Sequence, residues 1–239
     1  MGQPFRTDAG SEAAHSLAVE RPKTLLRTQV LDRLRQAIVT GHYRPGERLL
    51  ERELCEALGV SRTSVREALR QLEIEQLVVV GPRGRPSVAR LTSAEAGEIY
   101  RFREVLESAA VAGFIAHAPD EAFGRLQALT ERFAAALHGE DLKERLAVKA
   151  TFYDVLFSHA GNAPMRTVFE QLFNRIGFLR ARSLRHQERA ELRAREMRDI
   201  VDRIAERDVE RAQAAIVGHI RSVGEIAVRH LADEEARDG

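Results

Sequence analysis

The sequence predicts a mostly α-helical protein with two domains, a small one that ends in a β-hairpin and a larger one built from helices alone. Apolar residues recur at helical spacing from Thr24 almost to the C-terminus. The β-branched runs that interrupt this spacing are confined to residues 77–91. A length of 239 residues and a hydrophobic content of 44% suit one or two packed domains and exclude a wholly disordered chain.

The first domain is predicted to cover residues 24–91, after a leader of small and polar residues at 1–23 that is expected to be flexible. Apolar residues at helical spacing predict a first helix that ends at Gly41. Leucines at steps of four predict a second, short helix that ends at Gly59. A third helix begins at Ser61, whose hydroxyl makes it a good N-cap residue.

A β-hairpin is predicted to follow these three helices. The β-branched run at 77–80 leads into a turn rich in glycine and proline at 81–86, and an apolar return strand is expected at 87–91. The domain holds 12 arginines and 8 acidic residues, a net charge of +4, whereas the whole chain carries only +1. Such a basic excess is typical of a DNA-binding unit.

The second domain, residues 92–232, is predicted to be an all-helical bundle, and a charged tail is expected at 233–239. From residue 92 to the C-terminus the chain holds 22 basic and 25 acidic residues, a net charge of −3. Glycine and proline interrupt the helical periodicity at several points. The expected helices lie at 94–117, 120–138, 140–160, 164–185, 189–206 and 208–232.

The junction of the second and third helices meets the two requirements of a helix-turn-helix, a glycine in the tight turn and a second helix with one apolar and one polar side. Gly59 supplies the turn, and Arg62, Arg66 and Arg70 recur every four residues opposite the apolar face. Arginine binds phosphate or the edge of a guanine. A solvated face in which these arginines pair with glutamates is the alternative, and the turn, the hairpin and the regional charge favour DNA binding over it.

The motifs Arg33–Ile38, Gly41–Leu49 and Val60–Leu69 resemble the DNA-binding domain of the GntR family of bacterial transcriptional regulators. The resemblance covers nearly all of residues 24–91. It implies a winged helix-turn-helix, in which the third helix reads DNA and the hairpin is a wing in the minor groove or along the phosphates. The DNA contacts that it implies are Arg52, Arg62, Thr63, Ser64, Arg66 and the wing residues Arg83 and Gly84.

Three residues depart from the pattern of that family. Ser64 stands where many members have proline, Leu50 where a serine or another capping residue is common, and Gln76 where glycine is usual. Each departure bears on a helix end or on the angle of the wing. None of them removes a predicted contact residue.

The second domain resembles the FadR-type C-terminal domain of the same family, which is called FCD. The resemblance rests on Arg103–Glu107, on Ala160–Asn162 and on the run from Asp208 through Ala212 to His219. It implies a helical bundle that binds a small effector molecule and joins two copies of the chain into a homodimer. A dimer predicts a pseudo-palindromic operator in double-stranded DNA.

Many FCD domains hold a divalent metal with one aspartate and three histidines. By the resemblance, three of these positions fall here on Lys149, Tyr153 and Met197, and only His219 keeps a ligand of the family's type. An ammonium group and a phenol do not replace a carboxylate and an imidazole, and one histidine does not make a site. The expectation is therefore that the pocket contains no metal and needs no cofactor.

Lys149 instead supplies a positive charge where the family usually has a metal. We hypothesise that the effector is a small organic anion, such as a carboxylate, because a buried ammonium needs an anionic partner. An internal salt bridge from Lys149 to Glu107 or to another acidic residue is an equally weighted alternative. The expected effector-binding residues are Arg103, Lys149, Tyr153, Met197 and His219.

Together these features predict a sequence-specific, DNA-binding transcriptional regulator, with repression as the expected mode. Two other pockets stay open, a rearranged metal site that uses Asp154 and His159 and a pocket for a larger acyl-type ligand. An enzyme is not expected, since the sequence lacks a glycine-rich phosphate loop, a His-Glu-x-x-His motif and a serine elbow. A helical adaptor would leave the arginine-bearing turn and the hairpin unexplained.

The expected location is the cytoplasm, without contact to a membrane. Cys55 is the sole cysteine, which excludes an intrachain disulfide and a cysteine-cluster zinc site, and it is expected to pack where the second and third helices meet. No apolar run reaches the length that spans a bilayer, and the polar N-terminal residues do not form a secretion signal.

Overall fold

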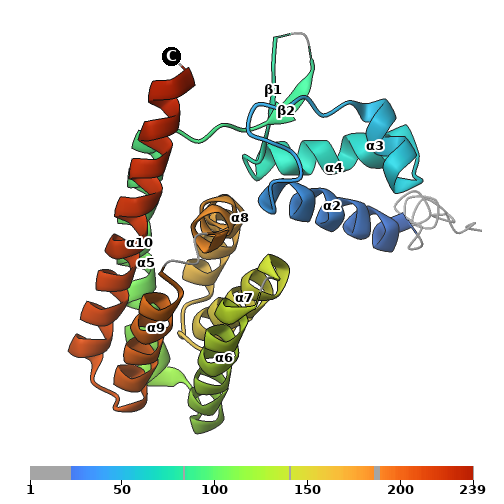
Figure 1. Ribbon diagram of the computed structural model, residues 1–239. Coiled ribbons are helices and arrows are strands. Elements are labelled where there is room, and N and C mark those ends of the chain that lie inside the picture. Colours follow the sequence, from blue (N-terminus) through green and yellow to red (C-terminus); the bar gives the residue numbers. More distant parts are fainter. Residues whose placement is uncertain (1–22, 83, 140, 186–188, 239) are drawn as a thin grey trace, which may run out of the picture.

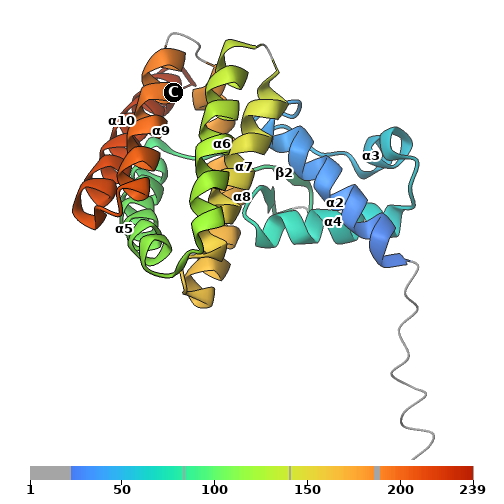
Figure 2. The same ribbon diagram turned by 90° about the horizontal axis from the view of Figure 1, so that it is seen from below.

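The two predicted domains are visible as two lobes in the computed structural model, which describes residues 23–82, 84–139, 141–185 and 189–238 (Figures 1 and 2). The small domain holds α2 (Lys23–Val39), α3 (Glu51–Leu58), α4 (Arg62–Ile74), β1 (Val78–Val80) and β2 (Pro86–Val88). The helical domain holds α5 (Ser93–His117), α6 (Asp120–His138), α7 (Leu142–Ser158), α8 (Ala163–Arg185), α9 (Ala190–Ala205) and α10 (Val209–Asp238).

The small domain is a winged helix-turn-helix whose three helices enclose a single apolar core. Val30, Leu34 and Ile38 of α2 are buried against the apolar faces of α3 and α4. The strands β1 and β2 pair antiparallel, with Val78 opposite Val88, and both valines are buried in the same core. Cys55 is half-buried against this core, as its position between the helices predicted.

The departures from the family pattern have structural consequences. Gln76 follows α4 with a left-handed φ of 58°, a conformation that is easy for glycine and strained for glutamine. Leu50 is the N-cap residue of α3 and makes no side-chain capping hydrogen bond. Ser61 caps α4, because its Oγ accepts the backbone N–H of Ser64 at 3.3 Å, a bond that proline at this position would lose. The strain of Gln76 and the missing cap at Leu50 both lower the stability of the small domain.

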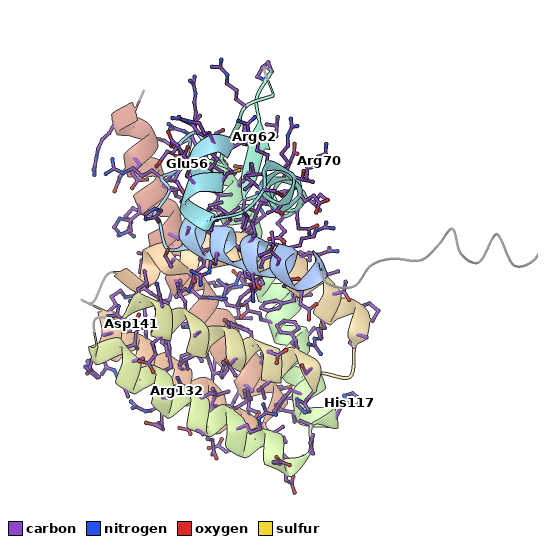
Figure 3. The ribbon with its side chains drawn as sticks, turned by 90° about the vertical axis from the view of Figure 1, so that its right-hand side faces the viewer. Glu56, Arg62, Arg70, His117, Arg132 and Asp141 are labelled. Carbon is purple, nitrogen blue, oxygen red and sulfur yellow. The ribbon has the colours of Figure 1, made fainter. Side chains whose placement is uncertain are left out.

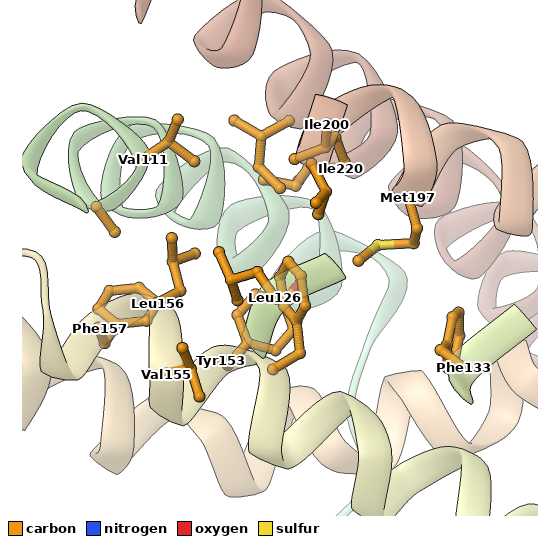
Figure 4. Close-up of a cluster of buried hydrophobic side chains, with 14 of the residues drawn as sticks. Val111, Leu126, Phe133, Tyr153, Val155, Leu156, Phe157, Met197, Ile200 and Ile220 are labelled. Carbon is orange, nitrogen blue, oxygen red and sulfur yellow. The ribbon is translucent and has the colours of Figure 1, made fainter. Parts of the chain in front are cut away.

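The helical domain is built around the antiparallel pair α5 and α10, which lie side by side along their whole length (Figure 1). The pair α6 and α7 packs beside them, and α8 and α9 complete the bundle. Figure 4 shows how side chains from α5, α6, α7, α9 and α10 face a common apolar interior, with Leu126, Leu156 and Ile220 fully buried. None of the helices described is long and apolar enough to cross a membrane.

Helix ends in this domain are set by local capping and by tertiary contacts. The start of α5 carries a complete capping box between Thr92 and Glu95, and Asp141 caps α7. The helix predicted to end at residue 232 continues in the structure to Asp238. Glu235 accepts hydrogen bonds from the backbone N–H and the hydroxyl of Ser93, at 2.8 and 2.7 Å, which attaches the end of α10 to the start of α5.

The two domains meet where α2 lies against α7 and α8 (Figure 2). Gly177 of α8 faces α2, and a Cβ placed there would lie 3.5 Å from Cγ1 of Val39. The first helix of the small domain therefore rests directly on the helical bundle. A movement of α8 would be transmitted to α2 by contact.

Candidate DNA interface and buried ligand cavity

The predicted recognition helix, α4, buries one side and exposes the other. Val65, Ala68, Leu69 and Leu72 are buried, whereas Arg62, Thr63, Arg66 and Arg70 are exposed. The turn before it uses Gly59, whose φ of 65° is left-handed. Figure 3 shows Arg62 and Arg70 on the small domain, on the side away from the helical bundle. This surface is free to enter a major groove.

The other predicted DNA contacts lie around α4. Arg52 is exposed on α3, and Ser64 is half-buried with its hydroxyl 3.0 Å from that of Ser61. Nε of Arg66 forms an ion pair with Oε1 of Glu51 at 3.0 Å. That pair is exposed to solvent, so the guanidinium can exchange the carboxylate for a phosphate at little cost.

The wing is partly described. Gly84 at its tip is exposed, with a left-handed φ of 67° and open space around it. Arg85 beside it is also exposed. Arg83, the second predicted wing contact, lies outside the described residues. The described wing residues thus present a tip without bulk, which suits a close approach to nucleic acid.

A buried cavity lies in the helical domain, and it brings together most of the predicted effector residues. Its volume is about 20 Å³, room for about one water molecule. Met197 of α9 borders it through its contact with Lys149, at 2.9 Å from Sδ to Nζ. The cavity is lined by Arg103, Phe133, Lys149, Tyr153, Arg180, Leu184, Arg193, His219 and Val223.

Arg103 is already paired within its own helix. Its Nε donates to Oε1 of Glu107 at 2.7 Å, one helical turn later, and its Nη2 donates to the hydroxyl of Tyr153 at 3.2 Å. Burial, and next the negative charge of Glu107, raise the pKa of Tyr153 to about 12. The carboxylate that the alternative assigned to Lys149 therefore belongs to Arg103.

Lys149 is buried without a carboxylate partner among the residues that the structure describes. Its Nζ lies over the rings of Phe133, Phe152 and Tyr153, at 5.0, 5.8 and 5.4 Å from their centroids. Its hydrogen bond goes to the thioether of Met197, a weak acceptor. Among the described residues no carboxylate oxygen lies within 4.0 Å of it. Burial, and next the charge of Arg180, lower the pKa of the Lys149 amine well below its usual range.

His219 belongs to a hydrogen-bonded group at the edge of the cavity. Its Nδ1 lies 2.7 Å from Oε2 of Glu196, and the other oxygen of that carboxylate accepts from Ser222 at 3.1 Å. Arg189 is 3.8 Å from the same carboxylate. Burial outweighs the bond to Glu196 and lowers the pKa of His219 to about 4. His219 is therefore a neutral imidazole at physiological pH.

Two buried arginines of the cavity were not predicted from the sequence. The Arg180 guanidinium stacks over Tyr153 and Phe173, at 4.7 and 4.6 Å, and its Nη2 is buried without a hydrogen-bond partner in the described chain. Arg193 is buried on α9. It precedes Met197 by four residues, so helical spacing from a predicted pocket residue could have found it. Nothing in the sequence of α8 distinguishes Arg180 from its arginine neighbours.

The side chains at the family's metal positions do not fit a metal. Lys149 and Met197 contact each other in the cavity, and a lysine and a thioether stand where the family has a carboxylate and an imidazole as ligands. Asp154, the alternative ligand, is exposed and pairs with Arg166 at 3.1 Å, while Nδ1 of His159 lies 2.9 Å from the carbonyl of Val155. Within the described ranges no three histidine, cysteine, aspartate or glutamate side chains cluster to hold a metal.

Comparison with known proteins decides the family. The sequence pattern of the bacterial regulatory proteins of the gntR family matches residues 26–88, and that of the FCD domain matches residues 98–222. The chain belongs to the GntR family. It carries a helix-turn-helix DNA-binding domain and an FCD domain, and it is a transcriptional regulator rather than an enzyme.

Relatives and solved structures agree with this assignment. YdhC of Bacillus subtilis is 30% identical over 207 residues, 86% of this chain and 92% of its own. McbR of Escherichia coli K12 is 32% identical over 153 residues, 64% and 69% of the two chains. The structure of E. coli McbR/YncC shares the fold, with a TM-score of 0.76 at 24% identity over 86% of this chain and 98% of that one. RspR of E. coli K12, 23% identical over 215 residues (90% and 94%), is named a transcriptional repressor.

Proposed function

We propose that this GntR-family regulator is a homodimeric repressor whose affinity for a pseudo-palindromic operator is set by a small organic anion in the buried cavity. Its DNA-binding residues are Arg52, Arg62, Thr63, Ser64, Arg66, Arg83 and Gly84. Its effector-binding residues are Arg103, Lys149, Tyr153, Met197 and His219, with Arg180 and Arg193 added from the geometry of the cavity.

The buried basic side chains of the cavity, Arg180 above all, carry the proposal for an anionic effector. Lys149, Arg180 and Arg193 line the cavity in addition to Arg103, the carboxylate of Glu107 is bonded to Arg103, and Nη2 of Arg180 has no hydrogen-bond partner in the described chain. Isolated buried charges are costly, so a site of this kind is stabilised by a bound anion. A carboxylate is the simplest ligand, because a guanidinium offers it paired N–H donors.

The position of Arg180 supports the link between effector and operator. Arg180 lines the effector cavity and also the groove between α2 and the helices α7 and α8. An anion bound to it changes the forces on α8, which touches α2 of the DNA-binding domain. A coupling free energy of about 1–3 kcal/mol between the two sites gives a useful switch.

The DNA part of the proposal is tested on an operator selected from a random duplex library. Gel shifts across a salt series are expected to show a steep loss of affinity with salt, because each phosphate contact releases counterions. Arg62→Ala and Arg66→Ala are each expected to lose about 1–3 kcal/mol of specific binding if they read bases. Arg132→Ala, an exposed arginine of α6 on the helical domain, is the matched control and is expected to bind normally. Normal operator binding by both α4 variants would show that α4 is not the reading element.

The effector part is tested by titrating organic acids against the wild-type protein and Lys149→Ala. An acid that binds the cavity is expected to release the operator from the wild type and to act at much higher concentration on the variant. Arg132→Ala, which removes an exposed cation of the helical domain outside the cavity and the groove, serves as the control. Equal affinity of every active acid for the wild type and Lys149→Ala would overturn the assignment of the cavity.

A further inference from the structure

We propose that Lys149 is a nucleophilic amine that captures the carbonyl carbon of a 2-oxo acid as an imine, with the acid's carboxylate held by Arg180. The inference rests on the proposed function and deepens it. It names the class of anion, and it turns the buried lysine from a simple counter-charge into a group that forms a bond with the effector.

The surroundings of Lys149 favour an uncharged amine. Nζ lies over three aromatic rings, and in the described part of the chain its one hydrogen-bond contact is the thioether of Met197. Arg180 and Arg103 add positive charge nearby, and Glu107 is held by Arg103. A lysine that is desolvated in an apolar site beside other cations has a free lone pair at neutral pH, which is the state in which lysines form imines with carbonyl compounds.

A site that can bind a carboxylate lies beside this amine. Arg180 lines the same cavity, and its Nη2 is buried without a hydrogen-bond partner in the described part of the chain. Its guanidinium and the Lys149 amine both contact the ring of Tyr153, at 4.7 and 5.4 Å from the centroid. A ligand that satisfies both groups at once therefore needs a carboxylate and an electrophilic carbon close together. A 2-oxo acid has the carbonyl carbon bonded directly to the carboxylate.

The chemical step is balanced without a co-reactant. The Lys149 nitrogen attacks the carbonyl carbon, and the C–O π electrons move to the oxygen, which is protonated to a hydroxyl. The nitrogen gives up two protons in total, the C–O bond breaks, and the oxygen leaves with both protons as water while the C=N bond forms. Nothing is oxidised or reduced, and hydrolysis reverses the step, as a regulator that must release its effector requires.

Access to the cavity involves the groove between the two domains. The cavity of about 20 Å³ is too small for an oxo acid, whereas the groove between α2 and the helices α7 and α8 holds about 350 Å³. The Arg180 side chain lines both spaces. Rotation of the Arg180 side chain joins the groove to the cavity and admits the ligand from the side that α2 covers. The capture of the ligand and the packing of α2 on the helical domain therefore depend on the same residue.

The experiment traps the imine by reduction. The full-length protein is incubated with glyoxylate or pyruvate and cyanoborohydride, and the modified lysine is located by peptide mass mapping, which is simple because the chain has only Lys23, Lys143 and Lys149. Lys149 is expected to react at least about tenfold faster than the exposed Lys143 of the same helix. Arg180→Gln is expected to slow the trapping of Lys149 more than that of Lys143, because Lys149 shares the cavity with Arg180 whereas Lys143 lines only the open groove.

Trapping of Lys149 at the rate of Lys143 or more slowly would overturn the imine proposal. The hydroxy acids glycolate and lactate, which lack the carbonyl, separate this failure from that of the proposed function. If they stabilise the protein against heat as well as the oxo acids do and no Lys149 adduct forms, anion binding stands and the imine is wrong. If none of these acids stabilises the protein and none is trapped, the proposal of a small carboxylate effector is wrong as well.

Discussion

The buried His219 makes the stability of the helical domain depend on pH in a defined direction. Its pKa is about 4 in the folded protein against 6.5 for an ordinary histidine. Between these values the unfolded chain binds a proton that the folded chain does not, so the free energy of unfolding falls as the pH falls. The contribution of His219 is present above pH 6.5 and is lost as the pH approaches 4.

The size of the effect follows from the two pKa values. Integrating the proton linkage from pH 7 to pH 5 gives a loss of about 2 kcal/mol from this one residue. His219→Asn is expected to remove that loss, because the amide nitrogen replaces Nδ1 as the donor to Glu196 and does not titrate. Most carboxylates stay ionised above pH 5, so this window isolates histidine.

Urea unfolding followed by circular dichroism at pH 7, 6 and 5 measures the difference. The wild type is expected to lose about 2 kcal/mol more than His219→Asn over this range. His138→Asn is the control, since that histidine is exposed on α6 and its ion pair with Glu191 lies in solvent. A loss in His219→Asn that parallels the wild type would refute the reasoning, because it would show that burial does not hold the imidazole neutral.

Three further outcomes are expected. The free energy of unfolding of the wild type is expected to rise from pH 7 to 10 and that of Lys149→Met to rise less, because lysine in the unfolded chain keeps a proton that the buried amine has lost. Urea titrations in which the free energy of unfolding of both proteins changes equally with pH would contradict this. Gln76→Gly raises the stability of the small domain by about 0.5–1 kcal/mol in thermal unfolding, since relief of the left-handed strain exceeds the added freedom of unfolded glycine; an unchanged melting temperature would count against it. Glu51→Gln frees Arg66 and is expected to raise operator affinity about fivefold in gel shifts. The control Glu56→Gln on the same helix is expected to have a smaller effect, and equal effects of the two changes would rule out the ion pair as the cause.

The helices were predictable because the sequence marks their ends. The predicted helix at 120–138 matches α6 to the residue, since Pro119 precedes it and Gly139 follows it. The end of α10 was missed because residues 233–238 are charged and carry no apolar period. The bond from Ser93 to Glu235 that holds this end joins residues 142 positions apart, and a local pattern cannot contain such a contact.

The cavity was predictable only in part, for a related reason. Lys149 and Tyr153 lie four apart on one helix, so the resemblance to the FCD domain placed both of them on the interior side, and the structure brings them together. Arg180 was missed because a buried arginine and an exposed arginine look alike in a sequence. Its burial is set by the ring of Tyr153 on α7 together with that of Phe173, seven residues earlier on its own helix α8.

The cavity and the domain interface share one residue, and this determines how a signal can travel. Before an anion binds, the Arg180 guanidinium lies over the rings of Tyr153 and Phe173, and its Nη2 has no hydrogen-bond partner in the described chain. Under the proposed function, a carboxylate that pairs with Arg180 would draw its guanidinium away from the groove that α2 covers. Because Gly177, nearly one turn earlier on α8, faces Val39 of α2, even a small shift of α8 changes the seating of the first helix of the DNA-binding domain. Under the proposed function, the effector acts on the operator through Gly177 and Arg180, which lie on the same side of α8, and a rearrangement of the recognition helix itself is not required.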